Sequence, residues 1–229
     1  MSCPLPLRAL LLLPLGATLL CSAQGLSAAE RQPDAQRGAV IAAQGTAAGA
    51  PPCAQCHAFN GVSDSSGAFP RLAAQPAYYL AKQLRDFASG TRDSAIMTPV
   101  SKALTLEEMQ DVAAYYATSE APFMPLAAGD AKLIEQGRSI ALKGNAAKDI
   151  QACNNCHGAE GAGEPPAIPY LAGQYAQSIV SAFDMWRSGY RKSSEGAMAV
   201  IAKQLDEQEI AAVAAYYQQV RTSALAAQK

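Results

Sequence analysis

Two five-residue stretches lie 100 residues apart in the chain: Cys53-Ala54-Gln55-Cys56-His57 and Cys153-Asn154-Asn155-Cys156-His157. In both, two residues separate the thiols and a histidine follows the second thiol directly. This Cys-x-x-Cys-His pattern is the attachment signature of c-type haem. Its spacing matches the two vinyl groups of the porphyrin, and the adjacent histidine then reaches the iron as the proximal ligand.

Cysteine and histidine usage in the rest of the chain supports this interpretation. The 229 residues include six cysteines and two histidines, and only Cys3 and Cys21 lie outside the two stretches. Two disulfides are one alternative. A zinc site is a second alternative, but it would need cysteines and histidines spaced as paired zinc knuckles. A thioredoxin-like redox pair would follow a predicted strand, and no strand pattern precedes either stretch. We therefore predict two haem c groups, bound covalently through four thiols: Cys53, Cys56, Cys153 and Cys156.

The N-terminal residues 1–29 have the composition of a cleaved export signal. Arg8 supplies a positive charge, and an apolar run of twelve residues, 9–20, follows it. Such a run is too short to span a bilayer as an uncleaved anchor, and Leu20 disfavours lipid attachment at Cys21. We expect a mature protein in the periplasm without a membrane span, for which peripheral membrane association stays open.

The similarity between the two halves extends beyond the cysteine motifs. Three segments recur at nearly the same offset: 70–75 as 169–174, 87–92 as 186–191, and 112–116 as 213–217. A duplication with two units predicts tandem domains and not a solenoid. We place them at residues 30–120 and 130–229. The linker, 121–129, lies in a stretch with Pro122, Pro125 and Gly129 that we expect to be extended and irregular.

The apolar periodicity predicts helices and no strands in either half. We expect a first helix at 34–44 and at 130–143, a middle helix that begins near Pro76, and a terminal helix in each half. Two capping boxes mark the starts of the terminal helices, Thr105 with Glu108 and Asp206 with Glu209. Aromatic residues are only 7% of the chain, so a haem in each core would supply apolar area that such small domains lack.

Met97 and Met198 are the candidates for the sixth position of the two irons. Without a spare histidine or cysteine, the remaining choices are Met, Tyr or an open position. Among the methionines outside the export signal, only these two match each other across the duplication. We expect both in loops between helices, because Thr98-Pro99 after Met97 favours extended backbone. A core filler is the alternative for either methionine.

Each histidine also needs a partner for its second ring nitrogen. Pro70 and Pro169 follow their histidines by 13 and 12 residues, and each begins a Pro-x-Leu. Their carbonyls are candidate acceptors, and a simple turn proline is the alternative. Trp186 and three arginines are candidate partners of the haem propionates, with core packing for the tryptophan and a solvated surface for the arginines as alternatives: Arg71, Arg92 and Arg191.

The order of these motifs resembles class I cytochrome c, and the tandem arrangement resembles the dihaem cytochrome c4 family. The resemblance covers nearly all of residues 34–220 and is strongest at 70–92 and Met97-Thr98-Pro99. It implies two tandem class I cytochrome c domains, each a small helical bundle around its haem, packed about a pseudo-twofold axis with the propionates inward. It also implies axial ligands and histidine-holding prolines at these positions: His57, Met97, His157, Met198, Pro70 and Pro169.

This chain departs from the family pattern at two places. Ala58 follows His57 where the family usually has glycine. Pro99 stands two residues after Met97, whereas Val200 stands two residues after Met198. These departures make the ligand role of Met198 the weaker of the two. They also predict unequal environments for the two haems.

A saturated iron passes electrons well and binds substrate poorly, so we expect an electron carrier and not an enzyme. The expected function is electron transfer between a respiratory donor and a terminal oxidase or reductase, with redox proteins as partners. The alternative is a dihaem subunit docked on a periplasmic dehydrogenase, for which Pro122-Phe123-Met124-Pro125-Leu126 is the candidate apolar contact. A net charge of −1 argues against nucleic-acid binding.

Overall fold

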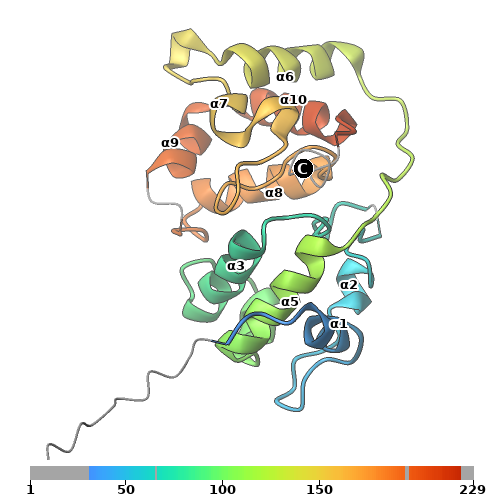
Figure 1. Ribbon diagram of the computed structural model, residues 1–229. Helices are drawn as coiled ribbons and strands as arrows, with labels where there is room; N and C mark the ends of the chain where they lie inside the picture. The colour runs from blue at the N-terminus through green and yellow to red at the C-terminus, as the bar shows by residue number, and fades with distance from the viewer. Residues whose placement is uncertain (1–30, 65, 194–195, 223–229) are drawn as a thin grey trace, which may run out of the picture. The chain divides into compact units, whose positions relative to one another are not determined.

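The computed structural model describes residues 31–64, 66–193 and 196–222 (Figure 1). The predicted export signal therefore lies outside the described residues. From Pro33 onward, the described residues belong to one compact unit. Within the described ranges the regular structure is helical, with isolated β-bridges and no extended strand, which confirms the predicted fold class.

Within the described residues, the same succession of five α-helices occurs twice. The first half has α1 (Ala35–Gln44), α2 (Ala54–His57), α3 (Ala77–Ser89), α4 (Met97–Lys102) and α5 (Leu106–Thr118). The second half has α6 (Ala131–Lys143), α7 (Asn154–His157), α8 (Ala176–Arg187), α9 (Ala197–Gln204) and α10 (Glu207–Gln219). Two 3-10 turns, η1 (Ala146–Lys148) and η2 (Ala159–Gly161), are added in the second half. Residues 119–130 between the halves carry no helix, as expected for the stretch around the linker.

Side-chain caps explain where the long helices begin. Asp34 accepts from two backbone N–H groups at the start of α1, and Asp130 does the same for α6. The predicted capping boxes of α5 and α10 are both present, with Thr105 and Asp206 as the N-cap residues. Each cap satisfies N–H groups that the first turn leaves without an intrahelical acceptor.

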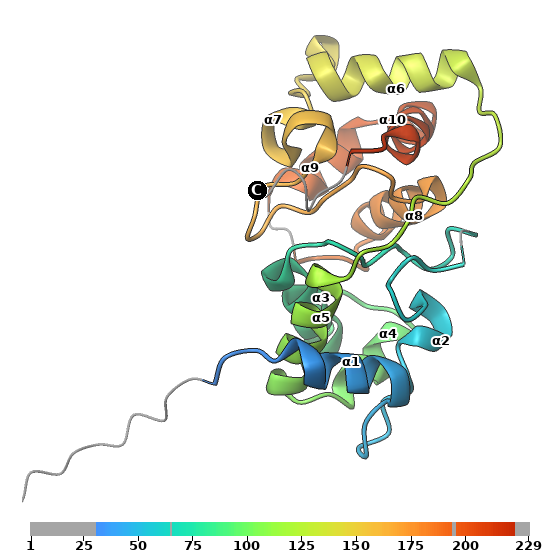
Figure 2. The same ribbon diagram turned by 45° about the vertical axis from the view of Figure 1, so that its right-hand side comes forward.

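In each half, the first and terminal helices cross at a glycine. Helix α1 packs on α5 and α6 packs on α10 (Figure 2). A Cβ added at Gly38 would lie 2.0 Å from the carbonyl oxygen of Asp111, and one at Gly137 would lie 1.9 Å from that of Ala212. The two crossings therefore require glycine, because any side chain would meet the backbone of the opposing helix.

Each half also has its own hydrophobic core. In the first, Met109, Val112 and Tyr116 of α5 pack with Leu80 of α3. In the second, the core groups residues of α8 and α10, among them Ile179, Phe183, Ile210, Val213 and Tyr217. Met109 is 3% exposed, so this methionine is a core residue.

The prediction that Met97 and Met198 lie in loops was wrong. Met97 is the first residue of α4, and Met198 is the second residue of α9. Pro99 falls in the first turn of α4, where a proline is tolerated because that N–H has no intrahelical acceptor. Residues 197–202 are rich in alanine, which favours the helix α9.

A third apolar cluster joins residues of the two halves. Ala74, Tyr170 and Ala172 form it, and Phe123 of the linker packs against it. The guanidinium of Arg71 lies 5.0 Å from the Phe123 ring centroid. Phe123 is therefore half-buried and packed against residues of both halves.

Candidate haem-binding sites

Each Cys-x-x-Cys-His stretch folds into a single helical turn. Cys53 directly precedes α2 and Cys153 directly precedes α7, and these helices end at His57 and His157. In each turn the backbone N–H of the histidine donates to the carbonyl of the first cysteine, four residues earlier, at 2.9 Å. Residues four apart lie on one face of a helix, so the first thiol and the imidazole share a face. All four thiols are free: Cys53, Cys56, Cys153 and Cys156.

Both imidazoles are buried and bound through the same ring nitrogen. Nδ1 of His57 lies 3.1 Å from the carbonyl oxygen of Pro70, and Nδ1 of His157 lies 3.0 Å from that of Pro169. Burial lowers the pKa of both histidines, against the opposing effect of these hydrogen bonds. A neutral ring that donates from Nδ1 leaves its Nε2 lone pair for a metal. The structure thus brings together each predicted histidine and its predicted proline.

The Pro-x-Leu segments are held by backbone hydrogen bonds. In the first half, Leu72 donates to Gly61 at 2.8 Å and Ala74 donates to Tyr116 at 3.0 Å. In the second half, Leu171 donates to Gly161 at 2.8 Å and Gly173 donates to Tyr217 at 2.7 Å. These bonds tie each proline loop to the segment after the histidine and to the terminal helix.

Burial raises the pKa of the Cys53 and Cys153 thiols. A reactive thioredoxin-like cysteine has the opposite property, a lowered thiol pKa. The redox-pair alternative therefore loses support. Tyr116 and Tyr217, the neighbouring tyrosines of α5 and α10, are also buried, and burial raises their pKa values.

Met97 and Met198 are half-buried, unlike the core methionine Met109. Met198 packs at the edge of the second core. Both methionines occupy equivalent places in the two halves, at the start of the short helix that precedes the terminal helix. Their role as iron ligands stays a prediction.

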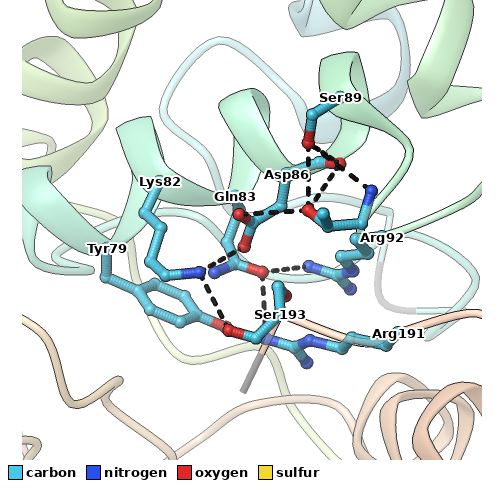
Figure 3. Close-up of polar contacts among 9 residues, drawn as sticks. Tyr79, Lys82, Gln83, Asp86, Ser89, Arg92, Arg191 and Ser193 are labelled. Carbon is cyan, nitrogen blue, oxygen red and sulfur yellow. Dashed lines mark hydrogen bonds and ion pairs between the residues drawn. The ribbon is translucent and has the colours of Figure 1, made fainter. Parts of the chain in front are cut away.

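A cluster of polar side chains joins α3 to the segment after α8 (Figure 3). Nη1 of Arg92 and Nη2 of Arg191 both donate to Oε1 of Gln83, at 2.8 and 2.9 Å, and Arg191 also donates to the Tyr79 hydroxyl at 3.2 Å. Burial and the neighbouring Arg191 lower the pKa of Arg92 to about 10. The sequence contained no signal for Tyr79 or Gln83, because neither residue has a chemical counterpart in the second half.

The predicted arginines are not solvated surface residues. Arg191 and Arg71 are each 6% exposed, and Arg92 is half-buried. The guanidinium of Arg92 stacks on Phe87 at 4.4 Å and that of Arg191 on Trp186 at 4.1 Å. Arg71 instead binds the linker, where Nη1 donates to the carbonyl of Pro122 at 2.8 Å.

Three buried donors in this region have no acceptor within the described part of the chain: Nε of Arg92, Nε of Arg191 and Nε1 of Trp186. Buried N–H groups are nearly always paired in proteins. Two cations and an indole N–H suit carboxylate acceptors, and a haem carries two propionates. With free thiols and an oriented imidazole in each half, the residues present fit two haem c groups.

Within the described ranges, none of the helices has both the length and the apolar character needed to cross a bilayer.

Comparisons with known proteins agree with this geometry. The model of a family described as cytochrome c oxidase, cbb3-type, subunit III matches residues 143–216. A relative from Stutzerimonas stutzeri (strain A1501), named thiosulfate dehydrogenase electron acceptor, is 38% identical over 89% of this chain and 92% of its own. Cytochrome c4 from Pseudomonas aeruginosa is 33% identical over 91% of this chain and 95% of its own.

A solved structure also matches. Thiosulfate dehydrogenase (TsdBA) from Marichromatium purpuratum, in its as-isolated form, superposes with a TM-score of 0.75 at 33% identity. The match covers 81% of this chain and 40% of that chain. This chain therefore spans less than half of the longer protein.

Proposed function

Because this chain belongs to the cytochrome c4 family, we propose that it is a periplasmic electron carrier between a respiratory donor and a terminal oxidase or reductase. The chain is a dihaem c-type cytochrome that transfers electrons, with two covalently bound haem c groups, in agreement with the sequence analysis. The observation that carries the proposal is the buried histidine with its Nδ1 on a proline carbonyl, repeated in both halves.

The proposed attachment sites are the four thiols of the two Cys-x-x-Cys-His turns: Cys53, Cys56, Cys153 and Cys156. We assign His57 and Met97 as the axial ligands in residues 30–120, and His157 and Met198 in residues 130–229. Each bound haem supplies a one-electron Fe(III)/Fe(II) couple. The protein orients the imidazoles through Pro70 and Pro169, and the thioether ligands raise the reduction potential.

We also propose that the chain has no catalytic site of its own. With histidine and methionine on both irons, no coordination position stays open for a substrate. Both histidines of the chain are used as ligands in this assignment.

The ligand assignment is tested on the holoprotein, expressed in a host that attaches haem c. We expect two haems per chain, a methionine-to-Fe(III) charge-transfer band, and no binding of carbon monoxide to the reduced protein. Met97→Ala and Met198→Ala should each remove one band and open one haem to carbon monoxide. Met124→Leu, in the linker, is the matched control and should keep both bands. Carbon monoxide binding by the unaltered protein would contradict the assignment, because it would show an iron position open to a substrate.

The periplasmic location is tested by cell fractionation, followed by measurement of the intact mass of the recovered protein by mass spectrometry. We expect the holoprotein in the periplasmic fraction, with a mass that lacks residues 1–29. A cytoplasmic holoprotein that keeps these residues would overturn the location.

The second candidate function is that of a dedicated electron acceptor for a dehydrogenase. The relative named thiosulfate dehydrogenase electron acceptor and the match to part of a thiosulfate dehydrogenase chain favour it. Stopped-flow mixing of the oxidised holoprotein with a thiosulfate dehydrogenase and thiosulfate distinguishes the two. Rapid reduction together with co-elution of the two proteins favours a docked acceptor. Reduction without co-elution favours a mobile carrier, and no reduction excludes thiosulfate dehydrogenase as the donor.

A further inference from the structure

Two glutamines at equivalent positions of the duplication bind across the two halves. Gln75 donates through Nε2 to the carbonyl of Tyr170 at 2.6 Å and accepts at Oε1 from the Tyr170 N–H at 3.1 Å. Gln174 repeats this arrangement with Arg71: its Nε2 donates to the carbonyl at 3.0 Å, and its Oε1 accepts from the N–H at 2.9 Å. Each side-chain amide therefore makes a pair of hydrogen bonds to a single residue of the other half.

The residues bound in this way directly follow the two prolines that hold the histidines. The peptide group between Pro70 and Arg71 accepts from His57 through its carbonyl and donates to Gln174 through its N–H. The peptide group between Pro169 and Tyr170 accepts from His157 and donates to Gln75. One conjugated amide thus links each histidine to a glutamine of the opposite half.

Hydrogen bonds in such a chain polarise one another, most strongly where water is excluded. When the peptide N–H donates to the glutamine oxygen, the carbonyl of the same peptide group becomes more negative. This proline carbonyl is then a better acceptor for the Nδ1–H of the histidine ring. Gln75 and Tyr170 are 4% and 3% exposed, and Tyr170 belongs to the apolar cluster with Ala74 and Ala172. Gln174 is half-buried, and its oxygen also accepts from the Tyr175 N–H, so its link to Arg71 is the weaker of the two.

We propose that Gln75 and Gln174 are positioning residues, and that each tunes the reduction potential of the haem in the opposite half. This inference rests on the proposed ligands His57 and His157. A stronger Nδ1–H bond makes an imidazole more basic, which stabilises Fe(III). Loss of a glutamine therefore raises the potential of the opposite haem. Separation of the two halves would raise the reduction potentials of both haems, so the packing of the halves and the two potentials are coupled.

The test is Gln75→Leu and Gln174→Leu in the holoprotein, each compared with Ser178→Ala. Ser178 donates to the carbonyl of Gly67 across the halves at 2.6 Å, a hydrogen bond that does not involve the peptide group after either proline. The readouts are the two midpoint potentials, assigned to each half by NMR of the labelled histidines, and hydrogen exchange of the Tyr170 and Arg71 amides. Gln75→Leu should speed exchange at Tyr170 about tenfold or more, as for loss of one buried hydrogen bond.

The expected pattern is crosswise. Gln75→Leu raises the potential of the haem near His157, Gln174→Leu raises that of the haem near His57 by less, and Ser178→Ala moves neither. Equal shifts of both haems, a shift confined to the variant's own half, or faster amide exchange with unchanged potentials would overturn the proposal. If a leucine variant does not fold, Gln75→Asn keeps the amide but shortens its reach and must show the same pattern. Haem content and the charge-transfer bands report separately on the ligand assignment.

Discussion

Arg92 and Arg191 meet as an antiparallel bridge that joins the two halves. The N–H of Asp93 donates to the carbonyl of Tyr190 at 2.6 Å, and the N–H of Lys192 donates to that of Thr91 at 2.7 Å. Two cations are thereby held close together, and both donate to the same oxygen of Gln83. Like charges in a buried place repel one another, so this arrangement depends on the polar groups that accept from them.

Gln83→Leu should destabilise the protein, because it removes the acceptor that both arginines share. Buried donors left without an acceptor cost about 1–3 kcal/mol. The free energy of unfolding, measured by denaturant titration of the holoprotein, is expected to fall by an amount in that range. Gln208→Leu, an exposed glutamine on α10, is the control. Equal stability of the two variants would show that Gln83 does not stabilise the pair.

Gly38→Ala and Gly137→Ala should both destabilise the helix crossings. The added methyl group would overlap a backbone carbonyl of α5 or α10, and overpacking of this kind costs about 1–3 kcal/mol. That loss exceeds the gain in helix propensity, about 1 kcal/mol. Thermal and denaturant unfolding measure the difference.

Gly49→Ala serves for comparison with these two variants, because a Cβ there meets no atom within 4 Å. It should cost only the strain of its positive φ of 98°. A stable Gly38→Ala protein with unchanged unfolding would mean that α1 shifts freely on α5.

Asp206→Asn should make stability less dependent on pH in the acid range. The Asp206 carboxylate caps α10 and contacts Lys148; the hydrogen bond from the Glu209 backbone, followed by that from Lys148, lowers its pKa below 3.8. A lowered carboxylate pKa contributes stability that is complete above the unfolded value and is lost as pH falls through the folded value. Denaturant titrations between pH 2 and 6 should therefore show a shallower acid loss in the variant. Glu207→Gln, in the same turn, is the charge-matched control. If Asp206→Asn lost stability at low pH as steeply as the unaltered protein, the Asp206 carboxylate would not be the group responsible.

Phe123→Ala should expose the linker to proteases. The ring packs on the Ala74–Tyr170–Ala172 cluster and lies under the guanidiniums of Arg71 and Arg221, at 5.0 and 5.1 Å. Its loss removes the apolar anchor of residues 119–130, and cleavage of an extended segment needs local release. Limited proteolysis followed by mass spectrometry should detect faster cutting between the halves than in Leu126→Ala. Equal cutting rates would mean that Phe123 does not anchor the linker.

Much of the architecture was predictable because it depends on local patterns. The capping boxes at Thr105 and Asp206 need only residues three apart, and the terminal helices need only an apolar stripe. The prediction that Met97 lies in a loop was wrong for a local reason. The residue before a proline, here Thr98, generally avoids the helical conformation, but the first turn of α4 tolerates Pro99. No local pattern distinguishes those two contexts.

The sequence by itself determined the cofactor class and the helical fold. Both follow from short spacings: two thiols and a histidine within five residues, repeated after 100 residues, and apolar residues at helical intervals. Only the tertiary structure decided that Gln75 and Gln174 bind the peptides behind the opposite histidines, and that Arg92 and Arg191 share Gln83. The contacts between the halves join residues about 100 positions apart, and their partners are backbone groups or a single amide oxygen. A backbone group has no sequence signature, so its partner emerges only when the halves pack.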